Sequence, residues 1–201
     1  RDVAPSRGLG DVYKRQFIGS VQSGYAQETG TDKPSFIPPF DFPITFSGNF
    51  GEIRANHFHG GLDFKTGGTI GKPVRALADG YISRIRVTHG SGYVLDVAYD
   101  NGYSTINRHL SAFVGDVARR VEDLQYEKES WEVEITPEPD EYPVKAGQII
   151  ALSGNTGYSF GPHLHLDMIE TATDEYIDPL PFFMNLSLIH ISEPTRRSYI
   201  S

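Results

Sequence analysis

The sequence predicts a mainly β protein, built on an antiparallel sheet into which one partly helical segment is inserted. Residues 81–87 and 93–99 each alternate apolar and polar side chains, which is the pattern of a strand with one buried face. Asp79-Gly80 and Asp100-Asn101-Gly102 lie beside these runs, and such sequences are typical of tight turns between strands. Short strands joined by glycine-rich turns indicate an antiparallel architecture.

Further strands are expected on both sides of this pair. They cover residues 73–78, 103–108, 148–153 and 163–169. Side chains alternate along a strand with period two, so in the last of these segments Leu164 and Leu166 are expected to face the core.

Residues 115–142 depart from the β pattern. Val117, Val121, Leu124 and Gln125 recur at roughly helical spacing, and an acidic run follows them. We expect a short helix, then a strand-like piece around residues 131–135, then a proline-rich loop. We interpret the whole segment as an insertion into the β core.

Both ends of the chain are expected to be non-native. Residues 186–196 correspond to a translation of a transposon adapter used in sequencing libraries, and residues 6–16 fit the reverse complement of the same adapter. The alternative is a genuine basic terminus and a genuine amphipathic tail. We exclude residues 1–16 and 186–201 from the prediction of the fold, and expect native sequence over about residues 17–185.

The composition excludes several classes of function. The net charge of the 201 residues is −8. Residues 1–16 carry four basic and two acidic groups and residues 186–201 two and one, which leaves 12 Lys and Arg against 23 Asp and Glu. So acidic a chain lacks the basic surface that nucleic acid requires. There are no cysteines for disulfides or thiol catalysis, and no apolar stretch is long enough to span a membrane.

A weaker pattern at residues 17–26 predicts export. Residues 17–21 resemble the end of an apolar signal segment, and Gly24 and Ala26 are small residues where a signal peptidase reads the chain. The alternative is a short disordered leader. We expect residues 17–46 to form a leader followed by an extended lead-in.

Two histidine motifs carry the strongest chemical pattern. They are His59-Gly60-Gly61-Leu62-Asp63 and His163-Leu164-His165. The glycine pair predicts a loop that enters a strand, and on a strand His163 and His165 point to the same side. Catalytic zinc takes three His, Asp or Glu ligands and leaves a fourth position to water. The motifs offer three such ligands and one spare histidine, which indicates a hydrolase.

Three other histidines, His57, His89 and His109, lie outside these two motifs. His109 closes the strand expected at residues 103–108, and it reaches the same cleft if that strand neighbours residues 163–169. His57 forms a second His-x-His with His59 and is a rival ligand, which we rank lower and expect beside the site. His89 is expected in an exposed turn.

A series of short motifs occurs in a fixed order along residues 47–183. They are Phe50-Gly51-Glu52-Ile53-Arg54, the His59 to Asp63 motif, Pro73-Val74-x-Ala76-x-x-x-Gly80, His109-Leu110, Val144-Lys145-Ala146-Gly147-Gln148, Ser153-Gly154-x-Thr156-Gly157 and Pro162-His163-Leu164-His165. Together they resemble the lysostaphin-type, or LytM-like, zinc peptidases that cut peptidoglycan. The resemblance implies an antiparallel β-sheet peptidase domain with an open groove over residues 47–183, interrupted by the insertion at about 115–142.

The resemblance also implies roles for individual residues. His59, Asp63 and His165 bind one zinc ion, while His109 and His163 are the catalytic histidines. The implied reaction is hydrolysis of the peptide crosslinks of peptidoglycan by metal-activated water, in the cell envelope or periplasm.

Some features depart from the family pattern or modify the cleft. Asn107 stands where an aromatic residue is frequent, and Asp167 stands where Glu is frequent; neither removes a ligand. The insertion is long enough to reshape one wall of the cleft. The loop at residues 154–161 contains three glycines, which predicts a groove wall close to an extended peptide.

Other functions fit parts of the pattern. They are a non-catalytic LytM-like regulator of other cell-wall hydrolases, a zinc peptidase acting on protein substrates, and a structural β domain with a chance histidine cluster. The presence of all five His and Asp positions disfavours the regulator. The scissile bond stays open between D,D crosslinks and glycine bridges, and the full-length protein has room for a regulatory domain or partner.

Overall fold

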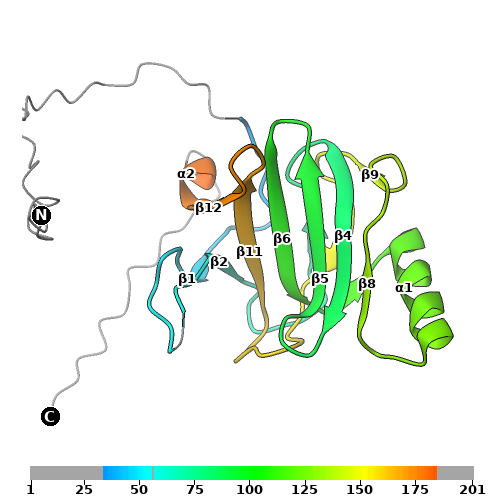
Figure 1. The fold of residues 1–201 in the computed structure, drawn as a ribbon. Coiled ribbons are helices and arrows are strands. Elements are labelled where there is room, and N and C mark those ends of the chain that lie inside the picture. The colour runs from blue at the N-terminus through cyan, green and yellow to red at the C-terminus, as the bar shows by residue number, and fades with distance from the viewer. Residues whose placement is uncertain (1–33, 56, 185–201) are drawn as a thin grey trace, which may run out of the picture. The chain divides into compact units, whose positions relative to one another are not determined.

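The computed structural model describes residues 34–55 and 57–184 (Figure 1). Within these residues, antiparallel strands form a nine-stranded main sheet and a three-stranded second sheet, which confirms the predicted fold class. The expected signal remnant at residues 17–26 and the expected adapter-derived ends lie outside the described residues.

The main sheet places strands from distant parts of the sequence side by side. Its order is β1 (Phe46–Gly48), β2 (Gly61–Lys65), β11 (His163–Glu170), β6 (Tyr103–Leu110), β5 (Gly92–Tyr99), β4 (Gly80–Thr88) and β8 (Val133–Ile135). In addition, β12 (Glu175–Ile177) pairs with β11, and β9 (Pro143–Val144) pairs with β4. The second sheet consists of β3 (Pro73–Arg75), β10 (Ile149–Leu152) and β7 (Ala112–Phe113).

The predicted strands are present, with some ends displaced. The strand expected at residues 73–78 ends at Arg75, and the strand expected at residues 103–108 continues to Leu110. His109 therefore lies within β6, near its end.

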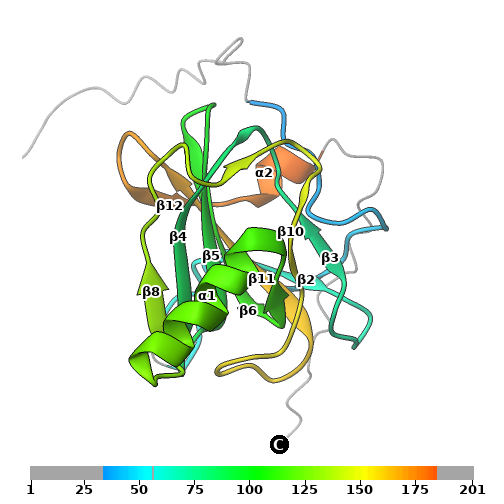
Figure 2. The ribbon, with the colours of Figure 1, turned by 90° about the vertical axis from the view of Figure 1, so that its right-hand side faces the viewer.

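The insertion folds much as its sequence predicts. Helix α1 (Gly115–Lys128) buries Val117, Val121 and Leu124, and β8 follows it as the strand-like piece. Strand β8 pairs with β4, so it forms the edge of the main sheet opposite to β1 and β2 (Figures 1 and 2). A second, short helix is α2 (Leu180–Phe183). Neither of these two helices, the ones present in the described residues, is long and apolar enough to cross a membrane.

The core lies on one face of the main sheet. Strands β2 and β11 contribute Leu62, Phe64, Leu164 and Leu166, all fully buried, as expected for the two leucines of β11. The lead-in before β1 packs into the same core through Phe36, Phe40 and Ile44. Polar residues of β2 and β11 are thereby left on the opposite face, where the histidine motifs lie.

Gly61 allows β2 to approach β11 closely. A Cβ atom at this position would lie 2.2 Å from the carbonyl oxygen of Leu166, closer than real Cβ contacts allow. The glycine is therefore required by backbone packing between the two strands that carry the histidine motifs.

Replacing Gly61 with alanine should force these strands apart. We expect Gly61→Ala to lower the free energy of unfolding by about 1–3 kcal/mol, measured by urea denaturation, because the added methyl group overpacks a rigid backbone contact. Gly161→Ala is the control, since nothing lies within 4 Å of a Cβ atom there. Equal stability of the two variants would show that the strands tolerate the extra atom.

Candidate metal centre

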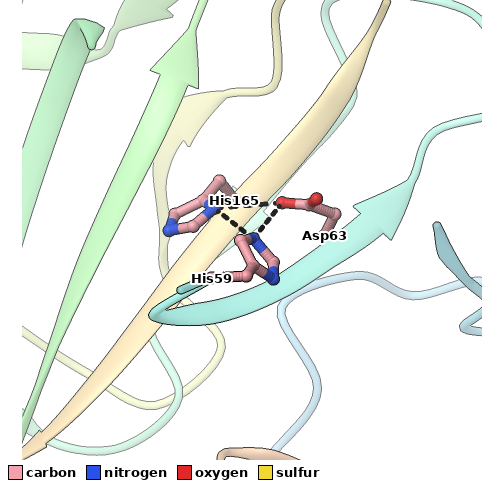
Figure 3. Close-up of side chains that lie close together, drawn as sticks. All are labelled: His59, Asp63 and His165. Carbon is pink, nitrogen blue, oxygen red and sulfur yellow. Dashed lines mark hydrogen bonds and ion pairs between the residues drawn. The ribbon is translucent and has the colours of Figure 1, made fainter. Parts of the chain in front are cut away.

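Strands β2 and β11 bring the two histidine motifs together. They pair antiparallel with Asp63 opposite His165, so both side chains project from the same face of the sheet. His59 lies just before β2, where its backbone exchanges hydrogen bonds with Gly51 and Glu52. Figure 3 shows the three side chains converging from these two segments.

The converging atoms form a compact triangle. His59 Nε2 lies 3.0 Å from Asp63 Oδ1 and 2.9 Å from His165 Nδ1, and the third side, His165 Nδ1 to Asp63 Oδ1, is 3.0 Å. Two imidazole nitrogens and one carboxylate oxygen at this separation are a suitable donor set for a divalent metal ion.

The other nitrogen of each ring fixes the tautomer that a metal ion needs. His59 Nδ1 donates to the main-chain oxygen of Asn49 at 2.7 Å, and His165 Nε2 donates to Asp167 Oδ1 at 2.6 Å. In the neutral rings, the nitrogens that face Asp63 therefore carry lone pairs. Three lone pairs pointing at one another repel unless a cation lies between them, so the arrangement fits a metal ion.

Electrostatics favour positive charge at this place. Burial works against ionisation of Asp63, but hydrogen bonds from His165 and His59 outweigh it and hold the pKa of Asp63 well below its usual range. Burial likewise disfavours a charged His165, but hydrogen bonds to Asp167 and Asp63 prevail and raise its pKa to about 9. A proton and a metal ion therefore compete for His165 Nδ1.

Asp167 and Arg108 support the cluster, and the prediction from sequence assigned them no role. Asp167 is buried, and its second oxygen accepts a hydrogen bond from Arg108 Nε at 2.8 Å. Burial raises the pKa of Asp167, but the bonds to His165 and Arg108 outweigh it and the net shift is downward. The period of two along β11 points His163, His165 and Asp167 to one face, so this position could have been found from the strand pattern.

Arg54 holds the other side of the carboxylate. Its Nη2 donates to Asp63 Oδ2 at 3.1 Å and to Glu52 Oε2 at 3.2 Å, which leaves Asp63 Oδ1 for the two histidines. Gly48 leaves room for this pair, because a Cβ atom there would lie 2.3 Å from Asp63 Oδ2.

His163 and His109 lie beside the triangle with one nitrogen each held by the main chain. His163 Nδ1 donates to the oxygen of Gly161 at 2.8 Å, and its Nε2 lies 3.5 Å from Asp63 Oδ1. His109 Nδ1 donates to the oxygen of Thr156 at 2.8 Å. The two ring centroids are 4.9 Å apart, so the structure brings all five predicted site residues together.

A β-bulge directs His109 towards the site. Between Tyr93 and Leu95 of β5, strand β6 contains one extra residue, and His109 adopts a φ of 59°, which is rare for residues other than glycine. Burial is the main cause that lowers the pKa of His109 to about 4. The ring is therefore neutral near pH 7.

The other two histidines lie outside the triangle. His57, the rival ligand, is exposed and lines the cleft without joining the three-residue cluster. His89 is exposed, as predicted, and stacks on Trp131 with ring centroids 5.0 Å apart.

The five residues line a cleft of about 1130 Å³. Its wall includes Tyr158 and Phe160, whereas Gly154 and Gly157 pack inward against backbone atoms of residues 109–111 and 90–92. The wall is therefore more aromatic than the glycine content predicted. No described residue of the insertion lines this cleft, because α1 and β8 lie at the far edge of the sheet. The insertion is long enough to reshape a wall, but it does not form one here.

The chain is similar in sequence to proteins named as peptidases. No protein-family profile matches the chain. It is 34% identical over 131 residues to glycyl-glycine endopeptidase ALE-1 of Staphylococcus capitis, which covers 63% of this chain and 29% of that protein. It is 32% identical over 109 residues to the DD-carboxypeptidase/endopeptidase Mpg of Neisseria meningitidis serogroup B, which covers 54% and 19%. The chain thus spans less than a third of the length of these relatives.

Among solved structures, a zinc-containing peptidase from Vibrio cholerae has a similar fold. The TM-score is 0.52 at 25% identity, and the match covers 73% of this chain and 39% of the other. The likeness and the His/Asp cluster together indicate a metal-binding peptidase fold.

Weakening the support of His165 should weaken metal binding. We expect Asp167→Asn to reduce the affinity for a divalent metal ion about tenfold, because a neutral amide accepts the His165 hydrogen bond less strongly. Competition with a chromogenic chelator measures the affinity. Asp174→Asn, an exposed change in the turn after β11, is the matched control, and equal affinities in both variants would contradict the role given to Asp167.

Proposed function

We propose that this chain, whose described residues form a LytM-like metallopeptidase domain, is a zinc-dependent endopeptidase that hydrolyses peptide crosslinks of bacterial peptidoglycan. The observation that carries the proposal is the triangle of His59, Asp63 and His165 with two further histidines beside it. Relatives named as a glycyl-glycine endopeptidase and a DD-carboxypeptidase/endopeptidase support peptidoglycan as the substrate. Because peptidoglycan lies outside the cytoplasmic membrane, we expect the protein to be exported.

One zinc ion held by His59, Asp63 and His165 would polarise the scissile carbonyl and lower the pKa of a water molecule. His109 and His163 then act on protons. Their Nδ1 atoms donate to main-chain oxygens, so Nε2 of each ring is the nitrogen left to exchange a proton in the cleft. These nitrogens orient the attacking water, accept its proton and return a proton to the departing amine.

Two alternative functions are a non-catalytic regulator and a peptidase that acts on proteins. A LytM-like regulator without catalysis is disfavoured, because the cluster is complete and its outer hydrogen bonds are in place. A peptidase acting on proteins shares the same chemistry and differs only in what the cleft accepts. A regulatory domain or partner of the full-length protein, which the sequence leaves open, is a separate proposal.

Substitution of single residues separates metal binding from proton transfer. We expect His165→Ala and Asp63→Ala to lose both bound zinc and hydrolysis, because each removes a ligand. His109→Ala and His163→Ala should retain most of the zinc and lose at least about 100-fold in kcat, as expected for a general acid or base. Zinc per protein is measured by atomic emission, with the exposed His89→Ala as the control. Full activity with retained zinc in His163→Ala would overturn the assignment.

Digestion of purified peptidoglycan tests the substrate. We expect the protein to release crosslink-cleaved fragments that mass spectrometry identifies, to lose this activity with a chelator, and to regain it with zinc. Casein serves as the protein substrate in parallel. Cleavage of casein without release of peptidoglycan fragments would favour the peptidase that acts on proteins.

A further inference from the structure

Lys65 is a cation beside the metal centre that the proposed mechanism does not use. It is the last residue of β2 and lies directly opposite His163 on β11. Because opposite residues of an antiparallel pair project from the same face, the Lys65 side chain shares the face of Asp63 and His163. It is exposed and lines the same cleft.

We propose that Lys65 determines substrate specificity by binding a carboxylate of an extended peptide in this cleft. The inference rests on the proposed peptidase function and adds to it the class of peptide that the cleft selects.

The charges along the cleft single out Lys65. Arg54 forms ion pairs with Glu52 and Asp63, and Arg108 forms one with Asp167. Among residues 34–55 and 57–184, no carboxylate forms an ion pair with Lys65. Its ammonium group is therefore available to an anion brought by the ligand, whereas both arginines are engaged within the protein.

The strand spacing sets where this anion would lie. Lys65 is two residues beyond Asp63, which corresponds to about 6.8 Å along an antiparallel strand. An extended peptide that follows β2 also advances about 3.4 Å per residue, so Lys65 would reach a carboxylate about two residues from the bond that is cut.

The turn at residues 66–69, which follows Lys65, leaves space for a substrate peptide to extend out of the cleft. Gly67 and Gly68 line it, and nothing lies within 4 Å of a Cβ atom at either position. Thr66 and Thr69 fix this turn, because each hydroxyl donates to the main-chain oxygen of the other residue. A substrate chain can therefore extend past Lys65, because no side chain projects from Gly67 or Gly68 and hydrogen bonds hold the turn.

This arrangement selects between the two crosslink types. A glycine bridge carries no side-chain carboxylate, whereas the stem peptides joined by D,D crosslinks carry free carboxylates. Lys65, which forms no ion pair among the described residues and lies about two residues from the metal centre, favours the acidic stem peptides.

Two matched substrates test the role of Lys65. They are a D,D-crosslinked stem-peptide dimer with free carboxylates and the same dimer with those groups amidated. We expect the unaltered protein to prefer the free carboxylates about tenfold in kcat/KM, the effect of one hydrogen-bonded charge pair. Lys65→Met should abolish the preference, and Lys65→Glu should reverse it. Lys128→Met on α1, which removes the same charge away from the cleft, should keep it.

Binding measurements separate failure of this inference from failure of the proposed function. Calorimetry of both dimers with the zinc-loaded His109→Ala variant, with and without Lys65→Met, reports the preference even if neither dimer is cleaved. Absence of hydrolysis by the unaltered protein would contradict the peptidase function. Equal affinity for the free and amidated dimers, or a preference that persists in Lys65→Met, would overturn the role of Lys65.

Discussion

The register between β2 and β11 is the constraint on which the site depends. Asp63 and His165 are 102 residues apart in sequence, yet the register places them opposite each other. A slip of β2 by one residue against β11 would turn Asp63 to the core face and expose Leu62, and the same slip of β11 would do this to His165 and Leu166. Burial of these leucines therefore fixes the register, and the register in turn forms the cluster. The close approach at Gly61 belongs to the same constraint, since the strands could not pair at this distance around a side chain.

Each of the four histidines at the site, His59, His109, His163 and His165, is held through the ring nitrogen that faces away from the reacting centre. Three of them donate Nδ1 to a main-chain oxygen, while His165 donates Nε2 to Asp167. The difference decides which atom is presented: His165 turns Nδ1 inward, and the others turn Nε2 inward. Rings held in this way lose little further conformational entropy when a ligand binds, so the site is preorganised.

The acidic composition of the chain does not describe its cleft. The negative charges at the centre, Asp63 and Asp167, are engaged by histidines and arginines, and Lys65 stands at one end without an ion pair among the described residues. At the other end, Phe58 and Tyr176 are exposed beside His59 and Gly60. The cleft therefore combines cationic and aromatic side chains, because Tyr158 and Phe160 are also exposed on its wall. The acidic insertion lies at the far edge of the sheet and does not line the cleft.

The sequence alone determined the local structure and the identity of the chemical groups. Period-two alternation predicted β4, β5 and the inward Leu164 and Leu166, and the spacing of Val117, Val121 and Leu124 predicted α1. Backbone geometry dictates such periods within a few residues, which is why they can be read from a single chain. Only the tertiary structure decided that β6 lies beside β11, that a bulge turns His109 into the cleft, that Asp167 and Arg108 support His165, and that the insertion lies away from the site. These features depend on strand order and on packing between segments that are far apart in sequence. Local sequence patterns do not predict the free energy of such contacts.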